Sequence, residues 1–253
     1  MLLAIDVGNT QIVIGLFDSN RLLGHWRFST RPILTADEYR MKFQSLFSMD
    51  GHEYAKIDNV IISSVVPRLT RELPTVFSSK KIYIADHTSP FSFPISLENP
   101  EQVGADRLVN AEAVFDEIDS SAIIVDSGTA TTICALSRER GYLGGAIIPG
   151  IEISFEALTA RAAKLSSVQL IAPKSVIGTT TEEALQSGMI FGYAEMIDGL
   201  VRRFKKEMNE LKIKVIATGG VGELLKDEAK EIEQFDPHLT LKGLRKLSES
   251  TFN

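Results

Sequence analysis

The chain has 253 residues, a formal net charge of −6, 44% hydrophobic residues and 24% charged residues. This length suits one large domain or two ordinary ones, and the composition is typical of a globular protein. The negative charge argues against broad nucleic-acid binding, and no apolar stretch is long enough to span a bilayer. The N-terminus lacks a basic leader, and the single cysteine, Cys134, suits a reducing compartment, so we expect a cytoplasmic protein.

The first half reads as a three-stranded meander followed by alternating helices and strands. Thr35 is a candidate N-cap with Glu38 at capping-box spacing. Three prolines make residues 89–100 an expected extended loop. The expected strands are 2–6, 12–17, 22–29, 59–66 and 81–85, and the expected helices are 35–48 and 107–116.

The second half repeats this plan. The expected strands are 122–126, its hairpin partner, 141–150, 214–217 and 239–241, and the expected helices are 151–164, 182–209, 223–230 and a last one from near Gly243. A tandem duplication of one α/β unit explains this order better than a continuous doubly wound sheet. We therefore expect an N-terminal domain of residues 1–117 and a C-terminal domain of residues 118–253.

One phrase occurs in both halves. Residues 5–16 read IDVGNTQIVIGL and residues 125–136 read VDSGTATTICAL. In each, an apolar strand ends in an aspartate, Asp6 or Asp126, followed by a glycine turn and a second apolar run, which predicts a β-hairpin. Glycine lets backbone N–H groups approach an anion, and the carboxylate can hold a cation beside phosphate oxygens. Local turn chemistry is the alternative, but the second copy favours a nucleotide grip and phosphoryl transfer.

Gly104-Ala-Asp-Arg107 follows the proline-rich loop. Phosphorylation of an alcohol needs a carboxylate to accept or orient the hydroxyl proton, which Asp106 can supply. Arg107 can hold a carboxylate or phosphate bidentately. The structural alternatives are that Asp106 is only a helix N-cap, and that Arg107 forms a surface ion pair with Glu112 or Asp116.

Two glycine-rich stretches are less specific. Residues 144–150, GGAIIPG, indicate either close approach of a substrate or a tight strand-to-helix connection. Residues 218–222, TGGVG, fit backbone packing against a nucleotide base or ribose. A Walker A sequence is absent, so a kinase of this sequence needs another phosphate grip. The histidines lack ligand spacing and Cys134 fits a core strand, so we expect no histidine or cysteine metal site.

Taken in order, these motifs resemble the type III pantothenate kinases, within the superfamily of sugar kinases, heat-shock ATPases and actin. The resemblance covers essentially the whole chain through IDVGNTQIVIG, TADEY, NPEQVGADR, VDSGTATT, GGAIIPGIEISFEAL, AAKL, TTTEEALQSG, TGGVGELL and LTLKGL. It implies a duplicated ribonuclease-H-like α/β fold, with two mixed sheets flanked by helices and an active-site cleft between them. It also implies ATP-dependent phosphorylation of the pantothenate hydroxyl to 4'-phosphopantothenate, the first step of coenzyme A biosynthesis.

The resemblance assigns roles to particular residues. ATP is expected at Asp6, Val7, Gly8, Asn9, Thr10, Gln11, Ile12, Val13 and Thr129. Pantothenate is expected at Gly104, Ala105, Asp106, Arg107 and Thr181, with Asp106 as the catalytic base. Asp126 is expected to hold a monovalent cation, K⁺ or NH₄⁺, and Asp6 is expected to bind Mg²⁺. Members are usually homodimers whose substrate site draws on the partner subunit.

The chain departs from the family pattern at three places. It has Cys134 where an aspartate is common, Leu97 where an aromatic residue is common, and Thr179-Thr180 where Lys-Asn is expected. These departures leave two alternatives open: a kinase of another small hydroxylated metabolite, or a non-catalytic nucleotide-binding regulator. The presence of both Asp6 and Asp106 disfavours the regulator, because a binding module has little need for a base.

Overall fold

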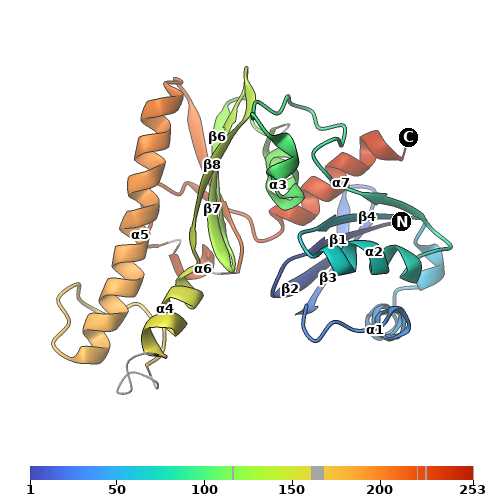
Figure 1. Ribbon diagram of the computed structural model, residues 1–253, viewed down its shortest axis with the longest axis horizontal. Helices are drawn as coiled ribbons and strands as arrows, with labels where there is room; N and C mark the ends of the chain where they lie inside the picture. Colours follow the sequence, from blue (N-terminus) through green and yellow to red (C-terminus); the bar gives the residue numbers. More distant parts are fainter. Residues whose placement is uncertain (116, 161–167, 221, 226, 253) are drawn as a thin grey trace. The chain divides into compact units, whose positions relative to one another are not determined.

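Each half of the chain builds one sheet from an antiparallel meander and two parallel strands. The computed structural model, shown in Figure 1, describes residues 1–115, 117–160, 168–220, 222–225 and 227–252. The chain forms two compact units, unit 1 from residues 1–117 and 238–253 and unit 2 from residues 118–237. The expected helical positions 116 and 161–164, and the AAKL motif at 162–165, lie outside the described residues.

Unit 1 contains a five-stranded sheet, sheet 1, in the order β3-β2-β1-β4-β5. β1, β2 and β3 are antiparallel neighbours, whereas β4 and β5 run parallel to β1. The strands are β1 (Leu2–Val7), β2 (Gln11–Asp18), β3 (Arg21–Ser29), β4 (Asn59–Ser64) and β5 (Lys81–Ile84), and the helices are α1 (Ala36–Met49), η1 (Tyr54–Lys56), α2 (Pro67–Val76), η2 (Pro100–Gln102), α3 (Ala105–Phe115) and α7 (Leu239–Thr251).

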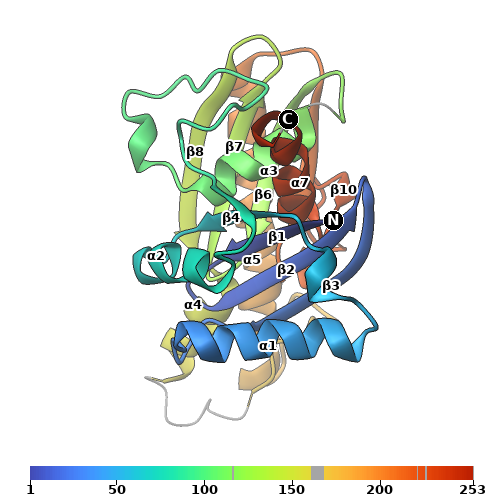
Figure 2. The ribbon, with the colours of Figure 1, turned by 90° about the vertical axis from the view of Figure 1, so that its right-hand side faces the viewer.

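Helices cover both faces of sheet 1, as Figure 2 shows. Successive side chains of a strand point to opposite faces, and in this sheet the side chains on both faces are apolar. Ile5 and Ile62 pack in a core with the aromatic face of α1 and the apolar face of α2. Ala4 and Ile61 pack on the other face, with Ala105 of α3 and the leucines of α7. The first turn of α1 carries the expected capping box, with Thr35 N–H donating to Glu38 Oε2 at 2.7 Å.

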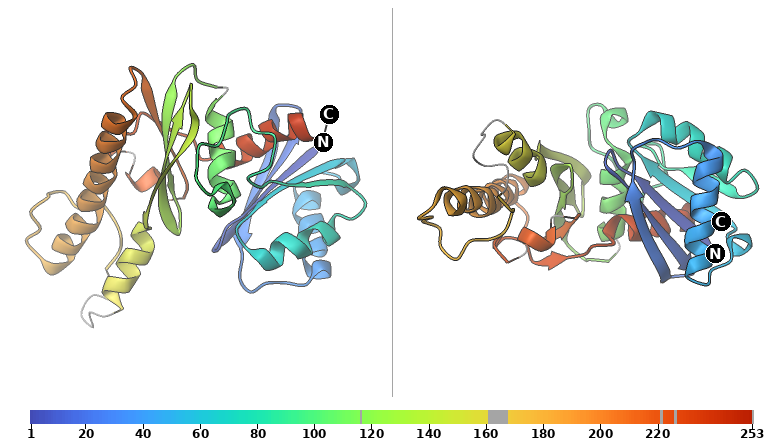
Figure 3. Two further views of the ribbon diagram at one scale, coloured as in Figure 1. Left: turned by 45° about the horizontal axis from the view of Figure 1, so that its top comes forward. Right: turned by 90° about the horizontal axis from the view of Figure 1, so that it is seen from below.

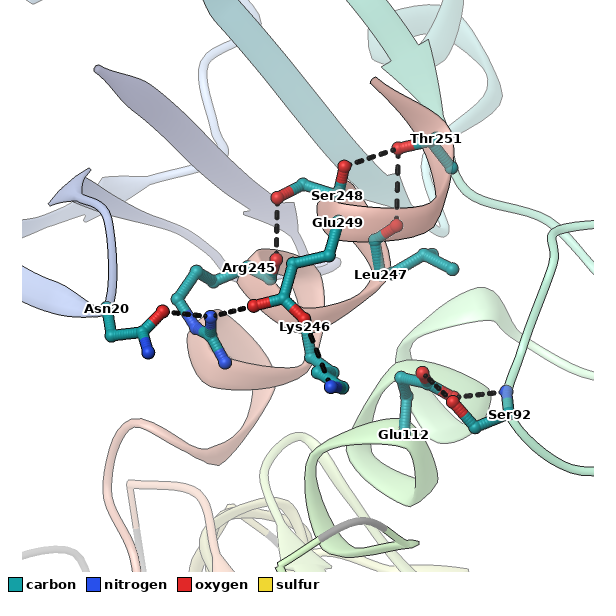
Figure 4. A network of polar contacts seen from close by, with 9 residues as sticks. All are labelled: Asn20, Ser92, Glu112, Arg245, Lys246, Leu247, Ser248, Glu249 and Thr251. Carbon is teal, nitrogen blue, oxygen red and sulfur yellow. Dashed lines mark hydrogen bonds and ion pairs between the residues drawn. The ribbon is translucent and has the colours of Figure 1, made fainter. Parts of the chain in front are cut away.

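The C-terminal segment belongs to unit 1, which differs from the expected domain of residues 118–253. Residues 239–241, expected as a strand, begin α7, which starts at Leu239 and not near Gly243. The reason is non-local: Leu241, Leu244 and Leu247 form one apolar face that is buried against sheet 1. Gly243 lies against the backbone of Val109 and lets α7 approach α3 closely. Arg245 also donates to Asn20 Oδ1 at 2.6 Å, as Figure 4 shows.

Unit 2 contains a second five-stranded sheet, sheet 2, with the corresponding order β8-β7-β6-β9-β10. Both sheets also carry a register shift in the second strand, between Leu16 and Phe17 in one and between Ala135 and Leu136 in the other. The shared order and shift support the duplication that the repeated phrase predicts. The strands are β6 (Ser121–Ser127), β7 (Ala130–Ser137), β8 (Gly141–Pro149), β9 (Ile213–Thr218) and β10 (Gln234–Phe235), and the helices are α4 (Ile151–Thr159), α5 (Thr181–Met208) and α6 (Gly222–Leu225).

Helix α5 runs along sheet 2 as the long orange helix of Figure 3 and contributes Ile190, Ile197 and Val201 to the core of unit 2. Other elements besides α7 differ from expectation, and the short elements β10, η1 and η2 were not expected. Helix α2 has no counterpart among the expected elements, because its first residue, Pro67, reads as a breaker although proline suits the first helical turn. Helix α6 is shorter than the expected 223–230. Among the described residues, no helix is long and apolar enough to cross a membrane.

Candidate active site

The first glycine turn connects β1 to β2 and is held from outside by Thr30. Gly8 N–H donates to Gln11 O at 2.9 Å and closes the turn. The Thr30 hydroxyl donates to Gly8 O at 2.8 Å, and Thr30 N–H donates to Thr10 O at 2.9 Å. Because Thr30 is buried and makes both of these hydrogen bonds, it holds the turn in position. Nothing in the local sequence pattern marks this residue, because it lies twenty-two positions from Gly8.

The residues expected at ATP in this turn divide by burial. Val7 and Ile12 are buried in the core of unit 1, so only their backbone groups face the turn. Asp6 and Gly8 are half-buried at its base. The side chains of Asn9, Thr10 and Gln11 are exposed at the tip of the turn. Val13 is half-buried opposite Asp6 in the strand register.

The start of α3 presents Asp106 in its first turn. Gly104 O accepts from Arg107 N–H at 3.1 Å, so the helix begins one residue before Asp106, which is therefore not the N-cap. Asp106 Oδ1 accepts from Arg107 N–H at 2.8 Å. Burial raises the pKa of the Asp106 carboxyl above its ordinary value, against the lowering effects of the Arg107 N–H and guanidinium. A carboxylate with a raised pKa is a suitable proton acceptor.

Asp6 and the start of α3 belong to the same face of sheet 1. Side chains alternate along a strand, so Asp6 shares its face with Ala4, which packs in the same cluster as Ala105 of α3. Val65, which directly follows β4, has its Cγ1 atom 3.6 Å from the position of a Cβ on Gly104. Unit 1 by itself therefore brings the first glycine turn and the Gly104–Arg107 segment to one end of one sheet face.

The proline-rich loop that leads to Gly104 is tied to α3 by a buried glutamate. Glu112 accepts from Ser92 N–H at 2.8 Å and from the Ser92 hydroxyl at 2.7 Å, as Figure 4 shows. Phe93 in the same loop lies 5.5 Å from the ring of Phe115. Glu112 is buried and bonded to the loop, which argues against the alternative in which it forms a surface ion pair with Arg107. The other partner in that alternative, Asp116, lies outside the described residues.

The second glycine turn, in unit 2, repeats the first with one residue fewer. Gly128 N–H donates to Ala130 O at 3.1 Å, and Gly150 N–H donates to Thr129 O at 3.1 Å, which matches the bonds of Gly8 and Thr30. Thr129 therefore corresponds to Thr10, and it is exposed like Thr10. Asp126 is half-buried at the base of the turn, as Asp6 is in unit 1.

The glycine-rich stretches pack around this second turn. A Cβ on Gly150 would overlap the carbonyl oxygens of Gly128 and Thr129, and one on Gly145 would overlap the backbone of β7. These contacts favour the tight-connection interpretation of residues 144–150. Gly219 has a φ of +94° and lies against the backbone of Ser127. Tyr193 of α5, which the sequence does not single out, donates to Pro149 O at 2.7 Å and lies 2.9 Å from the Thr131 hydroxyl.

Thr181 is exposed at the first position of α5, away from the second turn. Tyr193 of the same helix bonds to residues that flank that turn, and it lies twelve positions after Thr181, a rise of about 18 Å along the helix. The two residues before Thr181, Thr179 and Thr180, depart from the family pattern, and both bond to Glu183. The Thr180 hydroxyl accepts from Glu183 N–H at 3.1 Å, and the Thr179 hydroxyl donates to Glu183 Oε2 at 2.7 Å. The two threonines cap the helix.

No cluster of three or more histidine, cysteine or acidic side chains that would hold a metal occurs in the part of the chain that the structure describes. Mg²⁺ does not need such a cluster, since it commonly keeps several waters and binds through one or two carboxylates and substrate phosphates. The half-buried carboxylate of Asp6, at the base of a turn whose tip is exposed, fits that mode of binding.

The fold identifies the class of protein. Component A of the (R)-2-hydroxyglutaryl-CoA dehydratase of Acidaminococcus fermentans is similar with a TM-score of 0.59 at 13% identity, over 97% of this chain and 95% of that one. A candidate N-acetylglucosamine kinase of Porphyromonas gingivalis gives a TM-score of 0.52 at 13% identity, over the full length of both chains. The expected fold of two mixed sheets flanked by helices is confirmed.

Sequence relatives specify the family within this class. The profile of the type III pantothenate kinases matches residues 2–203. Type III pantothenate kinases of Exiguobacterium sp. and Myxococcus xanthus are 45% and 43% identical, over 98% and 97% of this chain and 98% and 96% of their own lengths. The chain belongs to the type III pantothenate kinase family, a family of kinase enzymes.

Proposed function

We propose that this protein transfers the γ-phosphoryl group of ATP to the hydroxyl of pantothenate, the first step of coenzyme A biosynthesis. The observation that carries the proposal, beside family membership, is the placement of Asp106 in unit 1. A half-buried carboxylate with a raised pKa lies at the same end of sheet 1 as a braced glycine turn. These are the parts that phosphoryl transfer to an alcohol needs, namely a phosphate grip and a base.

In this proposal the chain's own groups act in three ways. The ATP phosphates are assigned to the backbone N–H groups and the exposed side chains of the first turn, and Thr129 is assigned to ATP as well. Asp106 accepts the proton of the pantothenate hydroxyl as its oxygen attacks phosphorus, and Arg107 binds the pantothenate carboxylate. Asp6 would hold Mg²⁺, which would supply charge that offsets the phosphate oxygens, and Asp126 would hold a monovalent cation, K⁺ or NH₄⁺.

We further propose a homodimer in which Thr181 contributes to the partner's pantothenate site. Unit 2 exposes apolar side chains on β8, on α4 and in the segment before α5, and Figure 1 shows α4 and the start of α5 at the same end of the unit. Such side chains mark interfaces when they gather on one surface. They are Ile147, Ile153, Leu158, Ile171, Val176 and Ile177.

We place the reaction in the cytoplasm, because the sequence has a single cysteine, Cys134, and its thiol is buried. The structure weakens the alternative that the protein is a kinase of another hydroxylated metabolite. One of its two motives, Thr179-Thr180, is explained by the capping of α5. The other, Leu97, lies half-buried in the proline-rich loop.

The test is to mix the purified protein with ATP, Mg²⁺ and pantothenate, in KCl and separately in NaCl, and to follow ADP release and product mass. The proposal predicts pantothenate with one added phosphate, formed faster in KCl. ADP release with a panel of sugars and polyols, and none with pantothenate, would transfer the proposal to another metabolite. Nucleotide binding without any turnover would favour the regulator.

A further inference from the structure

Ser63 carries a buried hydroxyl that no described residue satisfies. Its side chain is fully buried, and Ser63 Oγ has no hydrogen-bond partner in the described part of the chain. Buried polar groups are nearly always hydrogen-bonded, so an exception calls for a ligand or a water. The neighbouring Ser64 is different, because its hydroxyl donates to Val66 O at 3.3 Å and accepts from Thr70 at 2.9 Å.

Ser63 is placed beside Asp6 by strand register. Asp6 of β1 pairs with Ser63 of β4 in the parallel ladder, so the two side chains project from the same face of sheet 1 on strands about 4.8 Å apart. Ile61, two residues earlier on β4, packs in the same cluster as Ala105 of α3, so this is the face that α3 covers. The unsatisfied hydroxyl therefore lies next to the carboxylate assigned to Mg²⁺ and toward the helix that carries Asp106.

The same pairing occurs in unit 2. Asp126 of β6 pairs with Thr218 of β9, which is buried. A carboxylate and a hydroxyl thus stand side by side at the end of each duplicated sheet. Two occurrences at corresponding positions favour a role at the two turns over a local packing accident in β4.

We propose that Ser63 is a positioning residue for the metal at Asp6, and that its hydroxyl donates a hydrogen bond to a water of the Mg²⁺ hydration shell. This inference rests on the proposed function, since it assumes a metal–nucleotide complex at the first turn. Mg²⁺ retains most of its waters in proteins, and outer-sphere donors orient them. Asp6 would bind the metal through its carboxylate, and Ser63 would orient one of the waters bound to that metal.

The test compares Ser63→Ala with Ser64→Ala, its neighbour on the opposite face. Mn²⁺, as a paramagnetic substitute for Mg²⁺, is titrated in the presence of a non-hydrolysable ATP analogue and followed by electron paramagnetic resonance. We expect Ser63→Ala to weaken Mn²⁺ binding about tenfold. Its thermal midpoint should not fall, because an unsatisfied hydroxyl is removed. Ser64→Ala should lower the midpoint and leave Mn²⁺ affinity unchanged.

Wild-type affinity for Mn²⁺ in Ser63→Ala would overturn the inference, and so would an equal loss of affinity in Ser64→Ala. The product assay on the wild type tests the proposed function separately. If the wild type phosphorylates pantothenate and Ser63→Ala retains full Mn²⁺ affinity, only the inference fails. If Mn²⁺ binding depends on Ser63 and the wild type phosphorylates another alcohol, only the assigned substrate fails.

Discussion

The Asp106 carboxylate occupies the space into which a side chain at Gly104 would project. A Cβ on Gly104 would overlap Asp106 Oδ1, whereas the nearest atom outside the Asp106 side chain, Val65 Cγ1, would lie 3.6 Å away. The glycine two residues before the aspartate therefore leaves room for the carboxylate to turn back over the start of α3. This relationship explains why the first residue of the Gly104-Ala-Asp-Arg107 segment is a glycine.

Gly104→Ala should displace the Asp106 carboxylate while leaving the fold intact, because a side-chain end can move more readily than backbone. A displacement of about 1 Å can cost about 100-fold in rate, so we expect kcat to fall by that order with a small change in thermal midpoint. Steady-state kinetics and thermal unfolding measure the two effects. Gly192→Ala is the matched control, since a Cβ there meets nothing within 4 Å and kcat should be unchanged.

The raised pKa of Asp106 predicts how stability depends on pH. The unfolded aspartate ionises near its ordinary pKa of about 3.9, whereas the folded carboxyl holds its proton to higher pH. Stability from this group is therefore fully present below about pH 3.9 and is lost as pH rises through the folded pKa. Asp106→Asn should unfold at higher denaturant than the wild type at pH 7, and the difference should vanish at low pH. A difference that is independent of pH would contradict the raised pKa.

Thr30→Val should loosen the first glycine turn. The change keeps the side-chain shape but removes the hydrogen bond to Gly8 O, so stability should fall by about 1 to 3 kcal/mol. The turn donors would then be less well positioned, and the Kd for an ATP analogue should rise. Denaturant unfolding and calorimetric titration provide the measurements. Thr75→Val, at an exposed hydroxyl bonded only within its own helix, is the control and should leave nucleotide affinity unchanged.

Features that depend on neighbours along the chain are predicted well from the sequence. The capping box of Thr35 and Glu38 forms both of its hydrogen bonds, and each glycine turn closes where its aspartate and glycine indicate. Strand pairing and helix packing are different. Ser63 becomes a site neighbour only when β4 pairs with β1, and residues 239–241 become helical because α7 packs across sheet 1. Neither relationship has a local signal in the sequence.

Asp126 predicts the response to monovalent cations. If its carboxylate holds K⁺, the replacement of KCl by NaCl should lower the turnover of the wild type sharply, because Na⁺ is too small for a site that suits K⁺. Asp126→Asn should have lower kcat in KCl and should lose most of this difference between salts. The comparison is of kcat for both proteins in both salts at equal ionic strength. An undiminished K⁺ preference in Asp126→Asn would place the cation elsewhere.

Asp106 is assigned as the base for the phosphorylation of pantothenate. The most direct measurement is the kcat of Asp106→Asn for phosphopantothenate formation from ATP and pantothenate, beside its Kd for a non-hydrolysable ATP analogue. A positioned general base contributes about 10² to 10⁴ in rate, so we predict a loss of that order in kcat with nucleotide affinity nearly unchanged. Turnover by Asp106→Asn comparable to that of the wild type would contradict this assignment.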